Sequence, residues 1–286
     1  MGITLVTRNT VDREVHFLDT SRYSDNTPLV KVPNFPALLD EKWDAVEVHI
    51  TRPEDFHPAM MLAKSLTANR ERVTSVELFI PYFPGARQDR RNPMGDVAFA
   101  ADYYANIVEY VGADWVTIYD PHSDVVPALM EYVKVVSVAD IAKFDEANAG
   151  HLQHRIYSGV IAPDSGAHRR ANLMAETLGV PKVFQAWKNR DVATGKLTGF
   201  GIEPIEPGHY LIVDDICDGG GTFNGLAASL PAGVTCDLYV THGLFSQGLR
   251  ELIKNFEQII TTDSLDKYVS HPQLKTINIH EWSIRP

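Results

Sequence analysis

The sequence predicts an α/β fold built on mainly parallel sheets, and two observations carry this prediction. Short apolar, β-branched runs recur along the 286 residues. Each is followed by a turn signal and then by a longer segment with helical spacing. Strands that alternate with helices form βαβ units, whose consecutive strands lie parallel. Because ligands of such sheets bind beyond the carboxyl ends of the strands, functional residues are expected there.

Eight short runs are expected to be strands because they are apolar and β-branched. In chain order they are AVEVHI at 45–50, SVELFI at 75–80, WVTIY at 115–119, VKVVS at 133–137, GVIA at 159–162, YLIV at 210–213, CDLYVT at 236–241 and QIIT at 258–261. Five segments have the length and spacing of amphipathic helices, namely 58–69, 97–111, 168–178, 222–230 and 248–255.

The number of strands is high for one compact sheet, so we divide the chain near Ser137 with a second crossing near Thr262. The expected domains are 1–136 plus 263–286, and 137–262.

The composition predicts a globular protein with an ample core. Hydrophobic residues make up 44% of the chain and charged residues 22%, and the formal net charge is -11. The acidic balance argues against a nucleic-acid partner, which requires clustered basic side chains. No stretch reaches the apolar length of a signal or a membrane span, so we expect a cytoplasmic protein without a membrane partner. Cys217 and Cys236 are too few for a disulfide framework or a zinc site, and we expect two buried thiols.

The stretch LIVDDICDGGGTFNGL at 211–226 carries the strongest functional signal. An apolar strand ends in Asp214 and Asp215, Asp218 follows, and three glycines then lead into a helix that begins at Thr222. Glycines at a helix N-terminus let backbone N–H groups approach an anion such as a phosphate. The carboxylates suit sugar hydroxyls, directly or through a divalent cation. A phosphorylated ribose satisfies both halves, whereas a glycine turn with solvated aspartates is the alternative.

Three further segments have functional and purely structural interpretations. ARQDRR at 86–91 follows a strand and is either a phosphate-binding or a solvated basic turn. In APDSGAHRRA at 162–171, Ser165 is a candidate helix N-cap beside an anion-receptive turn. The polar, glycine-punctuated segment 184–200 lacks a clear period and predicts a mobile insertion.

Five segments together resemble the ribose-phosphate diphosphokinase (PRPP synthetase) family. VDDICDGGGT at 213–222 resembles the ribose-phosphate loop of the wider phosphoribosyltransferase superfamily. The other four, in family order, are PYFPGARQDRR at 81–91, DPHSD at 120–124, APDSGAHRRA at 162–171 and THGLFS at 241–246. The resemblance extends from about Tyr23 to Ser246. It implies two tandem phosphoribosyltransferase-like domains, with the site between them, and a homo-oligomer.

The resemblance also implies roles for individual residues. It implies ATP-binding residues at Arg87, Gln88, Asp89, Tyr23, Asp25 and Asn26. It implies a ribose-phosphate site at Asp214, Asp215, Asp218, Gly219, Gly220, Gly221 and Thr222. It implies a diphosphate turn at Asp164, Ser165, Gly166 and Arg169, and Mg²⁺ held by His122 and Asp164. The family's catalytic Lys-x-Arg matches Lys188 and Arg190.

The implied reaction moves the β,γ-diphosphate of ATP to the 1-hydroxyl of ribose 5-phosphate. Gly219 stands where the family usually has threonine, which leaves more room at the 5'-phosphate. ADP-ribose is therefore an alternative acceptor, with Trp187 and Phe223 as candidates to stack on its adenine. Asn26 and Thr27 replace a glycine and a glutamate of the family, so adenine recognition or the subunit contact is expected to differ.

Two other functions remain open from the sequence. A phosphoribosyltransferase would use the same acidic loop to bind PRPP and transfer its ribose to a base. A non-catalytic regulatory relative would bind nucleotide but would lack the Lys-x-Arg that is present at Lys188 and Arg190.

Overall fold

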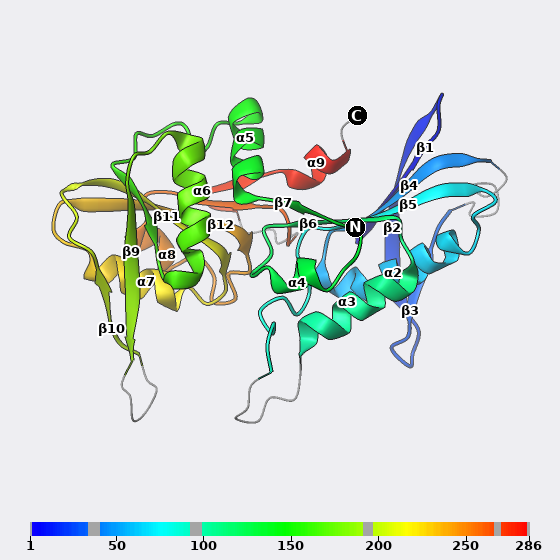
Figure 1. Ribbon diagram of the computed structural model, residues 1–286, viewed down its shortest axis with the longest axis horizontal. Helices are drawn as coiled ribbons and strands as arrows, with labels where there is room; N and C mark the ends of the chain where they lie inside the picture. The colour runs from blue at the N-terminus through cyan, green and yellow to red at the C-terminus, as the bar shows by residue number, and fades with distance from the viewer. Residues whose placement is uncertain (1, 34–40, 92–98, 191–196, 266–269, 285–286) are drawn as a thin grey trace. The chain divides into compact units, whose positions relative to one another are not determined.

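The computed structural model describes residues 2–33, 41–91, 99–190, 197–265 and 270–284, and the chain divides into two compact units (Figure 1). The first unit comprises Met1–Val136 with Ser264–Asp266 and Ser283–Pro286, and the second comprises Ser137–Asp263 with Lys267–Trp282. Each unit contains a sheet with its own helices. The predicted α/β class with mainly parallel sheets is confirmed.

The first unit is built on a sheet in the order β3-β2-β1-β4-β5-β6-β7. Its strands are β1 (Ile3–Arg8), β2 (Arg13–Arg22), β3 (Pro28–Lys31), β4 (Trp43–Ile50), β5 (Val73–Ile80), β6 (Trp115–Tyr119) and β7 (Val133–Val136). Strands β4 to β7 are parallel, whereas β1, β2 and β3 form an antiparallel extension. The helical elements are η1 (Pro53–Asp55), α2 (Phe56–Thr67), α3 (Ala100–Val111) and α4 (Val125–Ala128).

Helix α2 covers one face of the first sheet because its apolar residues recur with helical spacing. Phe56, Ala59, Ala63 and Leu66 are buried, and they join the core formed by the inward side chains of β4 and β5. Helix α3 lies against α2 on the same face (Figure 1) and ends at Gly112, which adopts the left-handed conformation that favours glycine.

The second unit is built on a sheet in the order β10-β9-β8-β11-β12-β13-β14. Its strands are β8 (Gly159–Ala162), β9 (Val183–Arg190), β10 (Leu197–Ile202), β11 (Gly208–Cys217), β12 (Val234–Gly243), β13 (Ile259–Thr262) and β14 (Leu274–Ile277). Neighbouring strands are parallel except for the β9–β10 pair. The helical elements are α5 (Val138–Asn148), η2 (Ser165–Ala167), α6 (His168–Leu178), α7 (Gly221–Ser229), α8 (Leu252–Asn255) and α9 (Ile279–Ile284).

Helices cover both faces of the second sheet, with α5 and α6 on one face and α7 and α8 on the other (Figure 1). The central strand β11 is apolar on both faces from Tyr210 to Val213, as a parallel strand between two helix layers must be. Cys217 and Cys236 are buried free thiols, which confirms the expectation for both. Burial raises the pKa of each thiol to about 12.

All eight expected strands are present, and the five expected helices correspond to α2, α3, α6, α7 and α8. Residues 97 and 98 of the expected second helix segment, 97–111, lie outside the described residues. Helix α8 starts at Leu252 instead of position 248, because Gly248 has a positive φ that ends regular structure before it. The antiparallel strands β1, β2 and β3 were not predicted, because polar residues interrupt the apolar run in β1 and β2 and because β3 begins at a proline.

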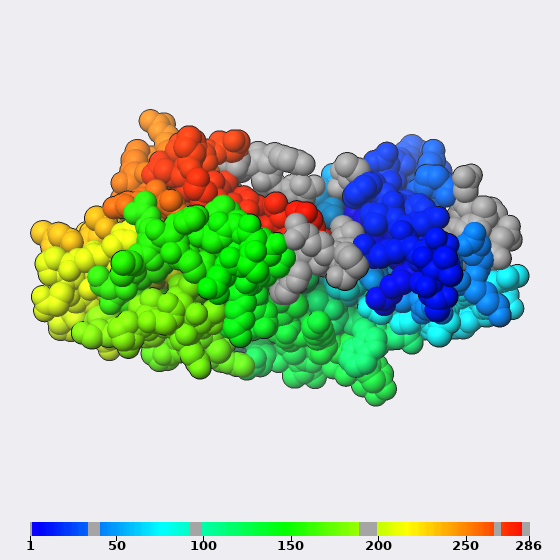
Figure 2. All heavy atoms as spheres, turned by 90° about the horizontal axis from the view of Figure 1, so that it is seen from above, coloured from blue at the N-terminus to red at the C-terminus, as the bar shows by residue number. Residues whose placement is uncertain are grey.

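Two larger expectations are corrected. Segment 184–200, expected to be a mobile insertion without a clear period, contains most of the hairpin strands β9 and β10, because inter-strand hydrogen bonds compensate for the weak apolar pattern. The C-terminal segment, expected in the first domain from position 263, instead pairs through β14 with β13 of the second sheet. Figure 2 shows its orange and red atoms gathered with the green and yellow atoms of the second unit.

Candidate functional site

The second sheet has a topological switch point between β8 and β11. These neighbouring strands are parallel, with Leu211 opposite Val160. The chain leaves β8 for α6 on one face of the sheet and leaves β11 for α7 on the other face (Figure 1). Ligands of open α/β sheets bind where the connections diverge in this way. The loops that follow the two strands, 163–167 and 218–220, are therefore neighbours at the carboxyl edge.

The acidic stretch lies at this edge, but its strand is longer than predicted. Strand β11 continues to Cys217, so Asp214 and Asp215 lie within the strand and only Asp218 lies in the turn. Gly220 has φ 76° and forms the N-cap of α7, a conformation that glycine adopts without strain. A Cβ atom added at Gly219 would meet only ordinary contacts. The nearest would be Cγ of Gln247, at 3.4 Å.

The end of β12 holds the turn after β11 in place. The backbone N–H groups of Leu244 and Phe245 donate to the carbonyl oxygen of Cys217 at 2.9 and 3.0 Å. The N–H of Ser246 donates to the carbonyl of Asp218 at 3.1 Å, and the Ser246 hydroxyl donates to the Asp218 carboxylate. The segment THGLFS therefore braces the acidic turn.

The buried Asp215 and the partly buried Asp214 face one arginine at the end of β11. Nη1 of Arg170, on α6, lies 3.8 Å from Oδ1 of Asp214 and 3.8 Å from Oδ1 of Asp215. Burial raises the pKa of Asp214 well above its ordinary value, the neighbouring Asp215 adds to that rise, and Arg170 opposes it. Sequence reasoning treated Arg170 only as positive charge beside the turn after β8, and it did not predict that Arg170 faces the β11 carboxylates.

The turn after β8 is organised by Asp164. Its Oδ1 atom accepts hydrogen bonds from the N–H groups of Gly166 at 3.0 Å and Ala167 at 3.3 Å. Asp164 thus caps η2, the role for which Ser165 was the candidate. The other carboxylate oxygen, Oδ2, lies 2.9 Å from Nζ of Lys188 on β9. The structure therefore brings two predicted site residues, Asp164 and Lys188, into direct contact.

The β9–β10 hairpin, which carries the predicted catalytic pair, is anchored by glycine contacts. The indole of Trp187 lies where a Cβ at Gly201 would be, and the ring of Phe200 lies where a Cβ at Gly225 of α7 would be. The hairpin is thereby fitted closely against α7. Trp187 is 46% exposed, whereas Phe223, the other aromatic residue considered for adenine stacking, is buried in the core. The side chain of Arg190 lies outside the described residues, although its backbone ends β9.

The predicted ATP residues of the first unit lie in two groups. Arg87 and Gln88 are exposed after β5, where Asp89 follows them. Tyr23, Asp25 and Asn26 form the turn between β2 and β3, in which Asp25 accepts from the N–H of Thr27 at 2.9 Å and has a lowered pKa for that reason. Strands β1 and β4 separate β2 from β5. At about 4.8 Å a strand, β2 and β5, which precede the two groups, lie about 14 Å apart in the sheet.

The two residues predicted to hold Mg²⁺ belong to different units. His122 is half-buried in the loop after β6, next to the strand end that precedes Arg87. Asp164 lies in the second unit, and its carboxylate side chain is 37% exposed. Carboxylate oxygens are the ligand type that Mg²⁺ prefers, so the donor chemistry of Asp164 fits the ion.

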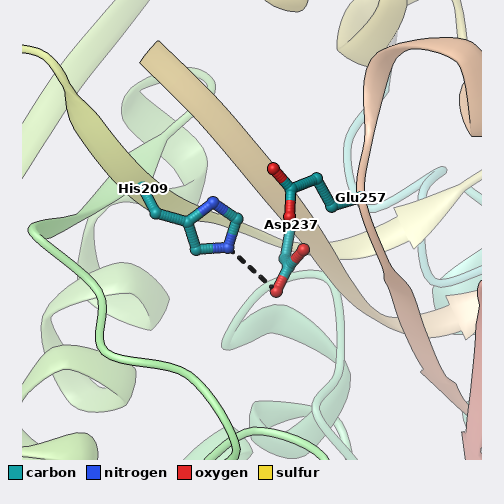
Figure 3. Close-up of side chains that lie close together, drawn as sticks. All are labelled: His209, Asp237 and Glu257. Carbon is teal, nitrogen blue, oxygen red and sulfur yellow. Dashed lines mark ion pairs between the residues drawn. The ribbon is translucent and has the colours of Figure 1, made fainter. Parts of the chain in front are cut away.

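A second charged cluster occupies the opposite, amino edge of the second sheet (Figure 3). His209, Asp237 and Glu257 offer ligand atoms within 4.8 Å of one another. His209 Nε2 lies 3.2 Å from Asp237 Oδ2, without the alignment of a hydrogen bond. Sequence reasoning missed this cluster because its members are separated in the chain and show no metal-ligand spacing.

The same carboxylates already have positively charged and hydrogen-bonding partners. The Tyr157 hydroxyl donates to Asp237 Oδ2 at 3.1 Å, and the Gln258 N–H donates to Oδ1 at 2.9 Å. Arg155 lies 3.5 Å from Asp237 and forms an ion pair with Glu257. Burial and the adjacent Asp237 raise the pKa of Tyr157, which keeps its hydroxyl a donor. We therefore interpret the cluster as structural.

Comparison with known proteins identifies relatives that match most of the chain. No family model matches the chain. The sequence is 29% identical over 223 residues to the ribose-phosphate pyrophosphokinase of Hyphomonas neptunium, which covers 77% of this chain and 69% of that protein. It is 30% identical over 210 residues to the ribose-phosphate pyrophosphokinase of Vibrio cholerae, with 72% and 65% covered. The chain thus spans about two thirds of the length of these relatives.

A solved structure shares the fold. The crystal structure of phosphoribosylpyrophosphate synthetase from Mycobacterium smegmatis matches with a TM-score of 0.76 and 20% identity, over 94% of this chain and 88% of that one. This match confirms the predicted α/β fold with two mainly parallel sheets. Within the described residues, no helix is long and apolar enough to span a membrane.

Proposed function

Because the chain belongs to the ribose-phosphate pyrophosphokinase family, we propose that it transfers the β,γ-diphosphate of ATP to the 1-hydroxyl of ribose 5-phosphate. The products are PRPP and AMP. The observation that carries the proposal is the pairing, at one switch point, of the acidic glycine turn after β11 with the Asp164 turn after β8. A pentose phosphate and a diphosphate need two such neighbouring turns.

The acceptor is proposed to bind at the turn after β11. Asp214 and Asp215 supply acceptors for the ribose hydroxyls, while the backbone N–H groups from Gly219 to Thr222 face the 5'-phosphate at the start of α7. A glycine with positive φ at the N-cap permits the close approach of backbone and phosphate.

The transferred group is proposed to pass over the turn after β8. The 1-hydroxyl oxygen forms a bond to the β-phosphorus of ATP, and the hydroxyl proton is released. The bond from the β-phosphorus to the oxygen that bridges the α- and β-phosphates breaks, and AMP leaves with that oxygen. Negative charge grows on the leaving oxygen, and cations near it lower the barrier. Lys188 and Arg190 are the proposed cations, with Arg169 on the diphosphate.

Mg²⁺ is the proposed metal, with Asp164 and His122 as its protein ligands. Mg²⁺ bound there would neutralise charge on the diphosphate. Lys188 lies 2.9 Å from Oδ2 of Asp164, so its ammonium would compete with the ion for this carboxylate. Arg87, Gln88 and Asp89 are proposed to bind ATP, together with Tyr23, Asp25 and Asn26. A homo-oligomer and a cytoplasmic location stay proposals.

ADP-ribose is a second candidate acceptor, favoured by one observation. A Cβ at Gly219 would have no contact closer than 3.4 Å, so the side chain missing at this position leaves space beside the proposed 5'-phosphate. An acceptor whose phosphate is esterified to a further group needs such space.

The test is AMP release from ATP and Mg²⁺ with ribose 5-phosphate, with ADP-ribose or without an acceptor. Lys188→Ala is expected to lower turnover by about a hundredfold or more, as the loss of a transition-state donor does. Lys182→Met serves as the matched control, because Lys182 is exposed at the amino edge of the same sheet. If the protein turns over neither ribose 5-phosphate nor ADP-ribose, the proposal is contradicted. Consumption of PRPP with a nucleobase, without ATP, identifies a phosphoribosyltransferase instead.

A further inference from the structure

Arg170 is a buried arginine that faces both carboxylates of the proposed acceptor site. Its side chain is 9% exposed, and the side chains of Asp214 and Asp215 are 15% and 6% exposed. Charged side chains are rarely buried to this extent unless charged partners face them. The two equal distances of 3.8 Å place one positive charge between two negative charges.

Two neighbouring carboxylates act on Asp214. Asp215 on its own strand and Asp164 before η2 both disfavour its ionised form, and burial does so most strongly, while Arg170 favours it. Lys188 is paired with Asp164, at 2.9 Å. Arg170 therefore contributes positive charge to Asp214 and Asp215 from helix α6.

The distances also show how Arg170 acts on this pair. A direct hydrogen bond between a guanidinium and a carboxylate is about 2.7 to 2.9 Å long, so 3.8 Å indicates attraction through charge at the two Oδ1 atoms. An ionised carboxylate is purely a hydrogen-bond acceptor, the property that sugar hydroxyls require. The positive charge of Arg170 therefore helps to keep Asp214 and Asp215 as hydrogen-bond acceptors.

We propose that Arg170 is a positioning residue that holds Asp214 and Asp215 ionised and in place for the hydroxyl face of a pentose phosphate. This inference rests on the proposed function of the same site. Arg170 acts through the two carboxylates, which separates it from Arg169, the exposed neighbour on α6 assigned to the diphosphate.

The test compares Arg170→Gln, which removes the charge and keeps a polar side chain, with the rescue variant Arg170→Lys and the control Lys182→Met. Calorimetry measures the affinity for ribose 5-phosphate from about pH 6 to about pH 8, the range above the ordinary pKa of aspartate. Arg170→Gln is expected to bind about tenfold more weakly at the lower pH, with a smaller loss at the higher pH. Arg170→Lys is expected to recover most of the affinity.

Wild-type affinity of Arg170→Gln at every pH overturns the proposal, and so does an equal loss at every pH that Arg170→Lys does not rescue. If Arg170→Gln does not fold, the double variant Arg170→Gln/Asp215→Asn restores the balance of charge. Recovery of folding in the double variant supports the proposal, and failure to recover indicates a packing role and overturns it.

A ligand-free measurement keeps the inference separate from the proposed function. Carbon-13 NMR of labelled aspartates, assigned with Asp214→Asn and Asp215→Asn, follows both carboxyl groups during a pH titration. Their apparent pKa values are expected to be higher in Arg170→Gln than in the wild-type protein. Unchanged titrations overturn the role of Arg170, whereas absent ribose 5-phosphate binding by the wild-type protein contradicts only the proposed acceptor.

Discussion

Replacing Gly225 by alanine tests how the β9–β10 hairpin packs on α7. A Cβ at this position would lie 2.1, 2.8 and 2.9 Å from three ring atoms of Phe200 on β10. Atoms in proteins do not approach so closely, so the ring and its strand must move. The same hairpin carries Lys188, and the same helix begins at the proposed phosphate turn.

Two effects of opposite sign decide the outcome. Alanine is favoured over glycine within a helix by about 1 kcal/mol. Overpacking a fitted contact costs about 1 to 3 kcal/mol. Because all three ring contacts fall below 3 Å, we expect the upper part of that range and a net destabilisation of about 1 to 2 kcal/mol. Turnover should fall as well, since the displaced hairpin moves Lys188.

Urea unfolding of three variants measures the prediction. Ala228→Gly, at an exposed position of α7, gives the helix-propensity effect for this helix alone. Phe200→Leu combined with Gly225→Ala should restore much of the stability, because the smaller side chain leaves room for the methyl group. If Gly225→Ala alone raises stability by the amount that Ala228→Gly lowers it, Phe200 does not lie against the helix and the reasoning fails.

Three further predictions concern charge. Folding raises the pKa of Asp214 above the ordinary aspartate pKa of about 4. The free energy of unfolding therefore falls as the pH rises above about 4 and Asp214 ionises. Asp214→Asn should therefore stabilise the protein at neutral pH, with a gain that shrinks toward about pH 4 in urea unfolding; a neutral-pH loss would contradict this. Lys188→Met should raise the affinity for Mn²⁺ in the absence of nucleotide, because the lysine ammonium no longer pairs with the Asp164 carboxylate. Equal affinities by calorimetry would refute competition between the ammonium and the ion. Asp237→Asn should destabilise the fold by about 3 kcal/mol, because Arg155 and the buried hydroxyl of Tyr157 lose a charged partner; a loss under about 1 kcal/mol would rule out this role.

The acidic pair on β11 shows a conflict between stability and the proposed function. Adjacent carboxylates in a buried strand repel each other and are poorly solvated, as the raised pKa of Asp214 reflects. Sites that bind polar ligands often retain such unfavourable groups, because the ligand supplies the missing partners. Arg170 limits the cost in the unliganded protein.

The sequence by itself determined the alternation of strands and helices, because apolar periodicity is a local property of the chain. It also determined the place of the acidic glycine turn, since glycine at 220 and the apolar run before it act within a few residues. Buried parallel strands such as β11 and β12 were readable for the same reason.

Only the tertiary structure decided which distant groups meet. The hairpin of β9 and β10 has no strong local signal and is stabilised by pairing with β8 and by the fit of Phe200 at Gly225. The C-terminal strand β14 joins the second sheet through hydrogen bonds to β13 that its sequence does not specify. The approach of Arg170 to Asp214 likewise depends on helix packing. The two residues are 44 positions apart in the chain and meet only when helix α6 packs against strand β11.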